Sequence, residues 1–196
     1  MARQEINIGA SANDGTGDTL RNSFDKVNDN SLELYQVSGW GQYVDDLTTA
    51  TQTINTTYSK LSINGAGGTS SSDYLPLEIR GSSELWDTVN NKILPINVGD
   101  SYDLRLDFTV TGKTGSPTLI DVVLDIGGGA SPTIDVVSRV VNTSKSPPFN
   151  VSIGFPIFSL NTFVTNGGQI FLRTDTGTVT VSKRSIFIKR DFSGNL

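Results

Sequence analysis

The chain contains no cysteine and no histidine. Disulfide crosslinks, thiol nucleophiles, imidazole bases and the commonest zinc ligands are therefore excluded, and only oxygen ligands remain for a metal. Acidic residues outnumber basic ones by 20 to 15, so the net charge of -5 provides no positive field to hold a phosphate backbone. We expect no nucleic acid partner and no cofactor.

Long hydrophobic runs are missing as well. No stretch approaches the ~20 apolar residues of a membrane helix, and Met1–Glu5 lacks the apolar core of a signal peptide. We therefore expect a protein that is made in the cytoplasm and does not insert into a membrane. A length of 196 residues is enough for one β-sandwich with a small appendage, but not for two full domains.

One amphipathic helix is predicted near the N-terminus, over residues 19–36. An extended piece at residues 6–10 and a turn-rich stretch, Asn13–Asp18, precede it, and Asp18 or Thr19 can cap its first turn. Its apolar residues recur at helical spacing and form one stripe: Leu20, Phe24, Val27, Leu34 and Tyr35. A segment of this size cannot bury such a stripe by itself, so the stripe must pack on something else.

The apolar period changes from 3.6 to 2 after Ser38, and we place the domain boundary there, with an N-terminal segment over 1–38 and a sandwich over 39–196. In Tyr102–Val110 the even positions are apolar and the odd ones polar, as in a strand with one buried face. The alternation returns at 120–126, 149–155, 170–172, 179–181 and 186–188, with glycine- or proline-rich turns between most of these runs. About eight strands at this spacing predict a mainly β fold, a β-sandwich of the jelly-roll kind.

The stretch from Ile6 to Tyr35 resembles a segment of tail-fibre-like and other virion structural proteins of tailed phages. The shared residues are Ile6-Asn7-Ile8-Gly9, Asn13-Asp14-Gly15-Thr16-Gly17-Asp18, Leu20-Arg21, Phe24, Lys26, Asn28, Asn30 and Glu33-Leu34-Tyr35. Ser31 stands where those proteins have phenylalanine. Further along, Gly39–Asp45, Tyr74–Pro76, Leu85–Asp87 and Gly177–Val181 resemble the jelly-roll domain of phage structural proteins, which is broadly like the tumour-necrosis-factor fold and commonly trimerises.

The resemblance implies a non-enzymatic structural protein on the surface of a bacteriophage virion. It implies a homotrimer that docks on other virion proteins, either the major capsid protein or tail and neck proteins, through the stripe Leu20, Phe24, Val27, Leu34 and Tyr35. We expect capsid decoration, as a cement protein, because no long shaft separates the helix from the sandwich. The alternative is a tail or head fibre module that recognises a host surface glycan or protein.

Three aromatic residues, Trp40, Tyr43 and Trp86, are candidates for a ligand or subunit contact. Core packing is the other interpretation, and it is the more usual one for large aromatic side chains. Lys183, Arg184, Lys189 and Arg190 frame the last strand, where we expect them to protect a sheet edge or to line a contact with an acidic neighbour.

Three patterns suggest chemistry but fit a structural role better. Gly112-Lys113-Thr114 lacks the earlier glycine of a phosphate-binding loop, so a hairpin turn is expected there. Asn13–Asp18 is oxygen-rich like a calcium loop but lacks the bidentate glutamate, which favours a helix-capping loop. The facing carboxyl pair of a glycosidase is not apparent, because the strand aspartates fall on outward positions or beside turns: Asp103, Asp107, Asp121 and Asp125.

Overall fold

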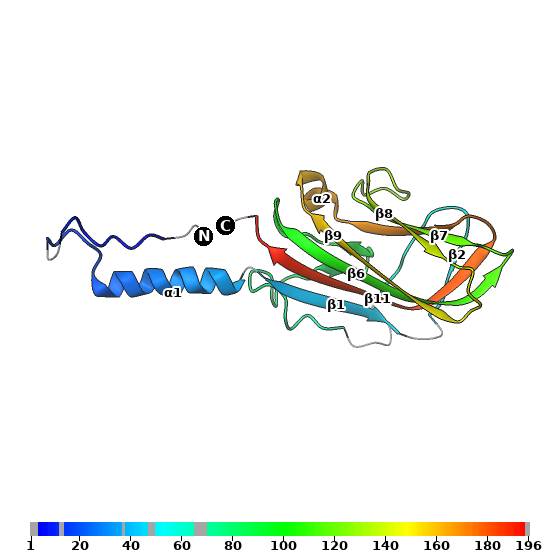
Figure 1. Ribbon diagram of the computed structural model, residues 1–196, viewed down its shortest axis with the longest axis horizontal. Helices are drawn as coiled ribbons and strands as arrows, with labels where there is room; N and C mark the ends of the chain where they lie inside the picture. The colour runs from blue at the N-terminus through cyan, green and yellow to red at the C-terminus, as the bar shows by residue number, and fades with distance from the viewer. Residues whose placement is uncertain (1–3, 12–13, 37, 47–49, 65–69, 195–196) are drawn as a thin grey trace.

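The structure is a computed structural model that describes residues 4–11, 14–36, 38–46, 50–64 and 70–194, without the side chains of residues 32–36. It has two visible parts (Figure 1). One is a sandwich of antiparallel β-sheets, and the other is an N-terminal arm, residues 4–36, that projects from one end of the sandwich along the long axis of the molecule.

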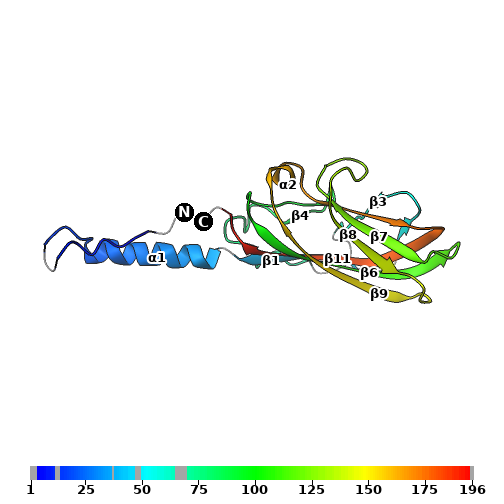
Figure 2. The same ribbon diagram turned by 45° about the horizontal axis from the view of Figure 1, so that its top comes forward.

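The arm consists of helix α1 (Leu20–Gln36) and the extended residues that run back beside it (Figures 1 and 2). Thr19 caps the helix, because its Oγ1 accepts a bond of 3.3 Å from the amide of Asn22. The Asn30 side chain bonds the amide and the carbonyl of Gln4 at 2.8 and 2.9 Å. The predicted extended piece is therefore held by the helix, and no strand is assigned among residues 4–11.

The sandwich has two main sheets. Sheet A has the order β1 (Gly39–Asp45), β11 (Thr178–Phe192), β6 (Ser101–Thr114) and β9 (Phe149–Phe158), with β2 (Gln52–Ile54) also paired to β11. Sheet B has the order β3 (Ser59–Lys60), β10 (Gln169–Thr174), β7 (Leu119–Asp125) and β8 (Asp135–Asn142). A two-stranded ribbon, β4 (Trp86–Asp87) with β5 (Lys92–Ile93), and the short helix α2 (Asn161–Asn166) complete the described elements.

This strand order is that of a jelly roll. With the eight strands β1, β3, β6, β7, β8, β9, β10 and β11 numbered along the chain, the sheets read 1-8-3-6 and 2-7-4-5. The two sheets form the two layers seen in Figure 2, and the chain passes repeatedly from one layer to the other. The predicted mainly β, jelly-roll sandwich is confirmed.

The core lies between the two sheets, where the alternating runs point their apolar residues. Tyr102, Leu104, Leu106, Phe108 and Val110 are each at most 2% exposed, and the apolar members of the later runs are buried with few exceptions. Strand β8 was not predicted. Its valines do not alternate with polar residues, and most of its positions are exposed, so it carries little of the signal of a one-faced strand.

Two expectations about β6 and β7 are wrong. Thr114 ends β6 in sheet A and Leu119 begins β7 in sheet B, so the segment after Gly112-Lys113-Thr114 crosses between sheets and forms no hairpin. Asp125 is fully buried instead of outward, and its carboxylate accepts bonds from the amides of Thr133 and Ile134, at 2.7 and 2.5 Å. A register shift in the pairing of β7 with β8 adjoins this residue and ends the alternation there.

The basic residues of β11 do not protect an edge either, since β11 lies between β1 and β6. Arg184 and Arg190 are only 3% and 1% exposed. Arg184 Nη2 lies 2.5 Å from Asp45 Oδ2, and Arg190 Nη1 lies 3.3 Å from Asp100 Oδ2. The acidic neighbours of these two arginines therefore belong to the same chain.

Candidate functional site: the N-terminal arm and the surface of sheet A

The far tip of the arm is a loop tied together by two aspartates. Asp14 accepts hydrogen bonds from the amides of Ala10, Ser11 and Thr16 at 2.6, 2.8 and 2.9 Å, and these bonds, that of Thr16 above all, lower its pKa to about 2. Gly9 lies beside that carboxylate with a φ of +81°, and a Cβ added to it would be 2.6 Å from Asp14 Oδ1. The loop thus needs glycine at this position.

The second aspartate, Asp18, joins the loop to the helix. It accepts a bond of 2.7 Å from Lys26 Nζ and one of 2.8 Å from the amide of Asn7, and the lysine is the main cause of its lowered pKa. Both carboxylates are thus engaged by donors of the arm itself. Among the described residues, no group of three or more His, Cys, Asp or Glu could hold a metal ion. Asn13 lies outside the described residues.

The described side chains of the apolar stripe of α1 are exposed. Leu20 is 75% exposed, Phe24 59% and Val27 42%, and Ile8 in the loop beside them is 89% exposed. Leu34 and Tyr35 lie in the last turns of α1, but their side chains are outside the described part of the chain. An exposed row of this kind on a helix that points away from the core is typical of a surface that meets another protein.

Two of the three aromatic candidates belong to the core. Tyr43 is 3% exposed and its hydroxyl donates to Glu84 Oε2 at 2.7 Å, while burial raises the pKa of that hydroxyl far above its usual value. Trp86 is 1% exposed and donates from Nε1 to the carbonyl of Ile63 at 2.9 Å. Neither can make the ligand or subunit contact considered for it, and core packing is the interpretation that holds for both.

Trp40 is different, because it stands half-buried on the outer face of sheet A. Its ring stacks on that of Tyr74 with centroids 4.9 Å apart and planes at 19°, and the Phe187 ring lies 5.4 Å away on β11. The guanidinium of Arg105 on β6 lies 5.5 Å over the Phe187 ring. A continuous row of planar groups therefore crosses β6, β11, β1 and the segment that flanks β1. Sequence periodicity alone does not reveal this row.

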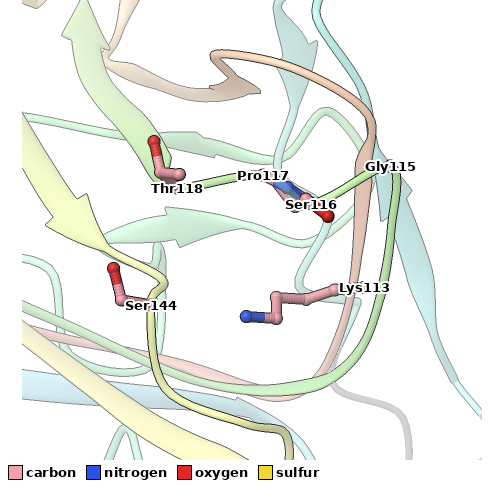
Figure 3. Close-up of a pocket in the computed structure, with 6 residues that line it drawn as sticks. All are labelled: Lys113, Gly115, Ser116, Pro117, Thr118 and Ser144. Atoms are coloured by element: carbon pink, nitrogen blue, oxygen red, sulfur yellow. The ribbon is translucent and has the colours of Figure 1, made fainter.

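A hollow of about 390 Å³ lies at the sandwich end opposite the arm, lined by Lys113, Gly115, Ser116, Pro117, Thr118 and Ser144 (Figure 3). The Lys113 ammonium donates to the carbonyls of Thr143 and Lys145, at 2.6 and 2.8 Å. The Thr118 hydroxyl donates to Asp175 Oδ2 at 2.5 Å, and this bond is the main reason why the pKa of Asp175 is lowered to about 2. These bonds connect loops of the fold at this end of the sandwich.

Comparison with known proteins decides the family. Residues 3–143 match the family described as Bacteriophage T4 gp9/10-like protein, N-terminal. The chain belongs to this family. It is a bacteriophage structural protein and accordingly a component of the virion. The match to the T4 gp9/10-like family covers the described arm and continues through the sandwich to the end of β8.

Other comparisons add little to the family match. The structure of Eiger TNF from S. frugiperda is similar with a TM-score of 0.48 and 8% identity, over 79% of this chain and 92% of that chain. The cryo-EM structure of Broad Bean Stain Virus is similar with a TM-score of 0.25 and 9% identity, over 81% and 85% of the two chains. No curated protein matches the sequence. No described helix is both long and apolar enough to span a membrane.

Proposed function

We propose that the chain is a trimeric, non-enzymatic structural subunit that docks on the phage particle through residues 1–38, while residues 39–196 form the outward sandwich. The projecting helix with its exposed stripe Leu20, Phe24 and Val27 carries this proposal. Burying a phenylalanine side chain contributes about 1.5–3 kcal/mol, so several such residues per copy make an effective anchor. Leu34 and Tyr35 extend the same stripe by their spacing in the sequence.

The spacing of the stripe supports the trimer. Leu20, Phe24 and Val27 follow one another by four and then three residues, which is the repeat of a coiled-coil seam, and Ser31 and Leu34 continue it in the sequence. The extended residues do not cover that seam, because Gln4 bonds the side chains of Asp29 and Asn30. Three arms can thus lie side by side with their extended segments outside. If their apolar rows close on one another, the tip loops, with Ile8 89% exposed, are the part of the arm that meets the particle.

The position on the particle has two candidates. The sequence favoured capsid decoration, whereas the T4 gp9/10-like family favours a tail-fibre or baseplate position. A decoration protein covers the capsid in many copies, but a tail component is present in few. Quantifying the chain against the major capsid protein, together with its location in a reconstruction of the particle, separates the two positions.

The trimer itself is tested in solution. Light scattering of the full chain is expected to give three times the chain mass of 21.0 kDa. A single-chain mass at micromolar concentration, together with single copies on the particle, would contradict the proposal.

A further inference from the structure

The two outer faces of the sandwich differ in character. On sheet A, Phe158 and Phe192 are 66% and 51% exposed, and Tyr74, in the segment that flanks β1, is 56% exposed. Trp40 and Phe187 are half-buried on the same face. Phe192 and Phe158 are both register partners of Ser101, so they stand on one face at one level of the sheet. We call Trp40, Tyr74, Phe158, Phe187 and Phe192 the aromatic face.

Among the described residues, sheet B has no exposed aromatic side chain, and its exposed apolar residues are aliphatic: Leu119, Val136 and Val140. Its outward residues Val123 and Phe171 are 1% and 0% exposed, so the chain itself covers them. Arg173 lies over the ring of Tyr58 and pairs with Asp121 at 2.9 Å. Aromatic exposure is therefore concentrated on sheet A, at the end from which α1 projects.

We infer that the aromatic face is the surface through which the sandwiches of neighbouring copies contact one another, an inference that rests on the trimer proposed above. The connection between the arm and the sandwich supports a second copy as the occupant. Helix α1 ends at Gln36 and β1 begins at Gly39, so three Cα steps separate them. They span at most about 11 Å. Three helices on a common axis therefore bring the first residues of β1, with Trp40, close to that axis.

The charges around the aromatic face also suit burial against a copy of itself. Arg105 Nε lies 3.0 Å from Asp107 Oδ2, and Lys189 Nζ lies 2.5 Å from Asp191 Oδ1. Asp103, exposed on the same face, is the register partner of Lys189. Each of these cations thus has an anion of its own chain, and burial at an interface leaves neither cation without a partner.

The placement of the Trp40 ring argues against a glycan that stacks on it. A pyranose ring needs a free aromatic face to stack on. The Trp40 ring has Tyr74 on one side and Phe187 on the other, since the segment Ser71–Tyr74 pairs with the edge of β1 that faces away from β11. Trp40 therefore presents its edge, which suits close packing of protein side chains.

Single cysteines test the inference in the full chain, which has no cysteine of its own. Gln42→Cys places a thiol on β1 opposite Phe187, within the aromatic face. Ser138→Cys is the matched control, an exposed strand position on β8 opposite Val123 in sheet B. With a short bismaleimide, Gln42→Cys is expected to convert most of the trimer to covalent dimer, and Ser138→Cys to remain single chains. Both variants should melt at the wild-type temperature.

Each other result overturns a specific statement. Suppose that light scattering shows a trimer but the Gln42→Cys thiols do not crosslink. The aromatic face is then not the contact between copies, although the chain is still a trimer. A single-chain mass without crosslinker refutes the trimer and this inference together. If the thiol of the trimer reacts freely with a monofunctional maleimide and becomes protected only on the particle or by host glycan, the occupant is that partner and not a second copy.

Discussion

At the scale of single residues, the two buried arginines of β11 have the clearest energetic role. Arg190 is enclosed near the arm end of the sandwich with Asp100, whose Oδ2 also accepts bonds of 2.8 Å from the Tyr102 hydroxyl and 3.1 Å from the amide of Asn97. A buried pair of this kind stabilises little relative to an apolar replacement of both partners. Removing only one partner is costly because a buried charge remains uncompensated.

Arg190→Met should accordingly lower the free energy of unfolding by about 3–5 kcal/mol, since the buried Asp100 carboxylate and the Glu78 carboxylate, 2.8 Å from Arg190 Nη1, would both lose this cation. Urea denaturation at neutral pH measures the change. Lys183→Met is the control, because the Lys183 side chain is 49% exposed and its nearest carboxylate, that of Asp46, is 3.8 Å away. That variant should change stability by about 0.5 kcal/mol or less. Equal effects of the two substitutions would contradict the assigned role of Arg190.

Phe24 is the residue on which attachment should depend most. It lies between Leu20 and Val27 on the stripe and is 59% exposed in the single chain. If its ring is buried on docking, Phe24→Ala removes about 3–5 kcal/mol of packing per copy. Binding to particles that lack the protein should then be greatly reduced, while the melting temperature of the sandwich stays unchanged.

Asp25→Ala, next to Phe24 but off the stripe and exposed, is the matched control and should bind normally. Light scattering of Phe24→Ala then shows what the stripe contacts. If the variant is still a trimer but no longer binds the particle, the stripe contacts the particle. If the variant is a monomer, the stripe contacts the helices of the other copies. Unchanged binding to the particle would show that the helix is not the attachment element. A much lower melting temperature would place Phe24 in the core of the sandwich.

At the scale of elements, the loop at the tip of the arm behaves as a small unit held by one carboxylate. The folded pKa of Asp14, about 2, lies below its ordinary value of 3.8. A group with a lowered folded pKa stabilises the fold only while it is ionised. Its contribution is therefore complete above the ordinary value and is lost as the pH falls through about 2.

Asp14→Asn should loosen this loop at neutral pH, because the amide side chain is a weaker acceptor for Ala10, Ser11 and Thr16 than a carboxylate. Hydrogen exchange of those amides should become faster, with the sandwich amides unaffected. Asp25→Asn, outside the loop, should leave exchange as in the wild type. Acidification of the wild-type chain should reproduce the loosening only near pH 2, and loosening already at pH 5 would contradict the assignment to Asp14.

At the scale of the whole molecule, the arm and the sandwich are built to different requirements. Every buried member of the hydrophobic core among the described residues lies between Tyr43 and Ile188, so the core uses none of the described side chains of the arm. The described side chains of the α1 stripe, by contrast, are exposed. This division motivates the proposal that the two parts act as separate units.

Deleting residues 1–38 should thus leave a sandwich that melts at nearly the temperature of the full chain but no longer binds the particle. Calorimetry and co-sedimentation with particles measure the two effects. Binding of the truncated chain at full occupancy would move the attachment surface to the sandwich, and failure to fold would show that the arm stabilises it after all.

Much of this architecture is readable from local sequence. The predicted helix over 19–36 is found as Leu20–Gln36, and the alternating residues of β6, β9, β10 and β11 point into the core as expected. Helical and strand periods are properties of neighbouring residues, so they need no knowledge of the rest of the fold. The sequence also determines that α1 has an apolar stripe that the arm cannot bury by itself.

Only the tertiary structure decided what depends on contacts between distant residues. It places β11 between β1 and β6, which turns Arg184 and Arg190 from expected edge residues into buried partners of Asp45 and Asp100. It also assembles the row of Tyr74, Trp40, Phe187 and Arg105 from four separate segments of the chain. Strand order is set by long-range pairing, and in a jelly roll most neighbours in a sheet are far apart in sequence. The periodicity of a strand shows that it has a buried face but not which strand lies beside it.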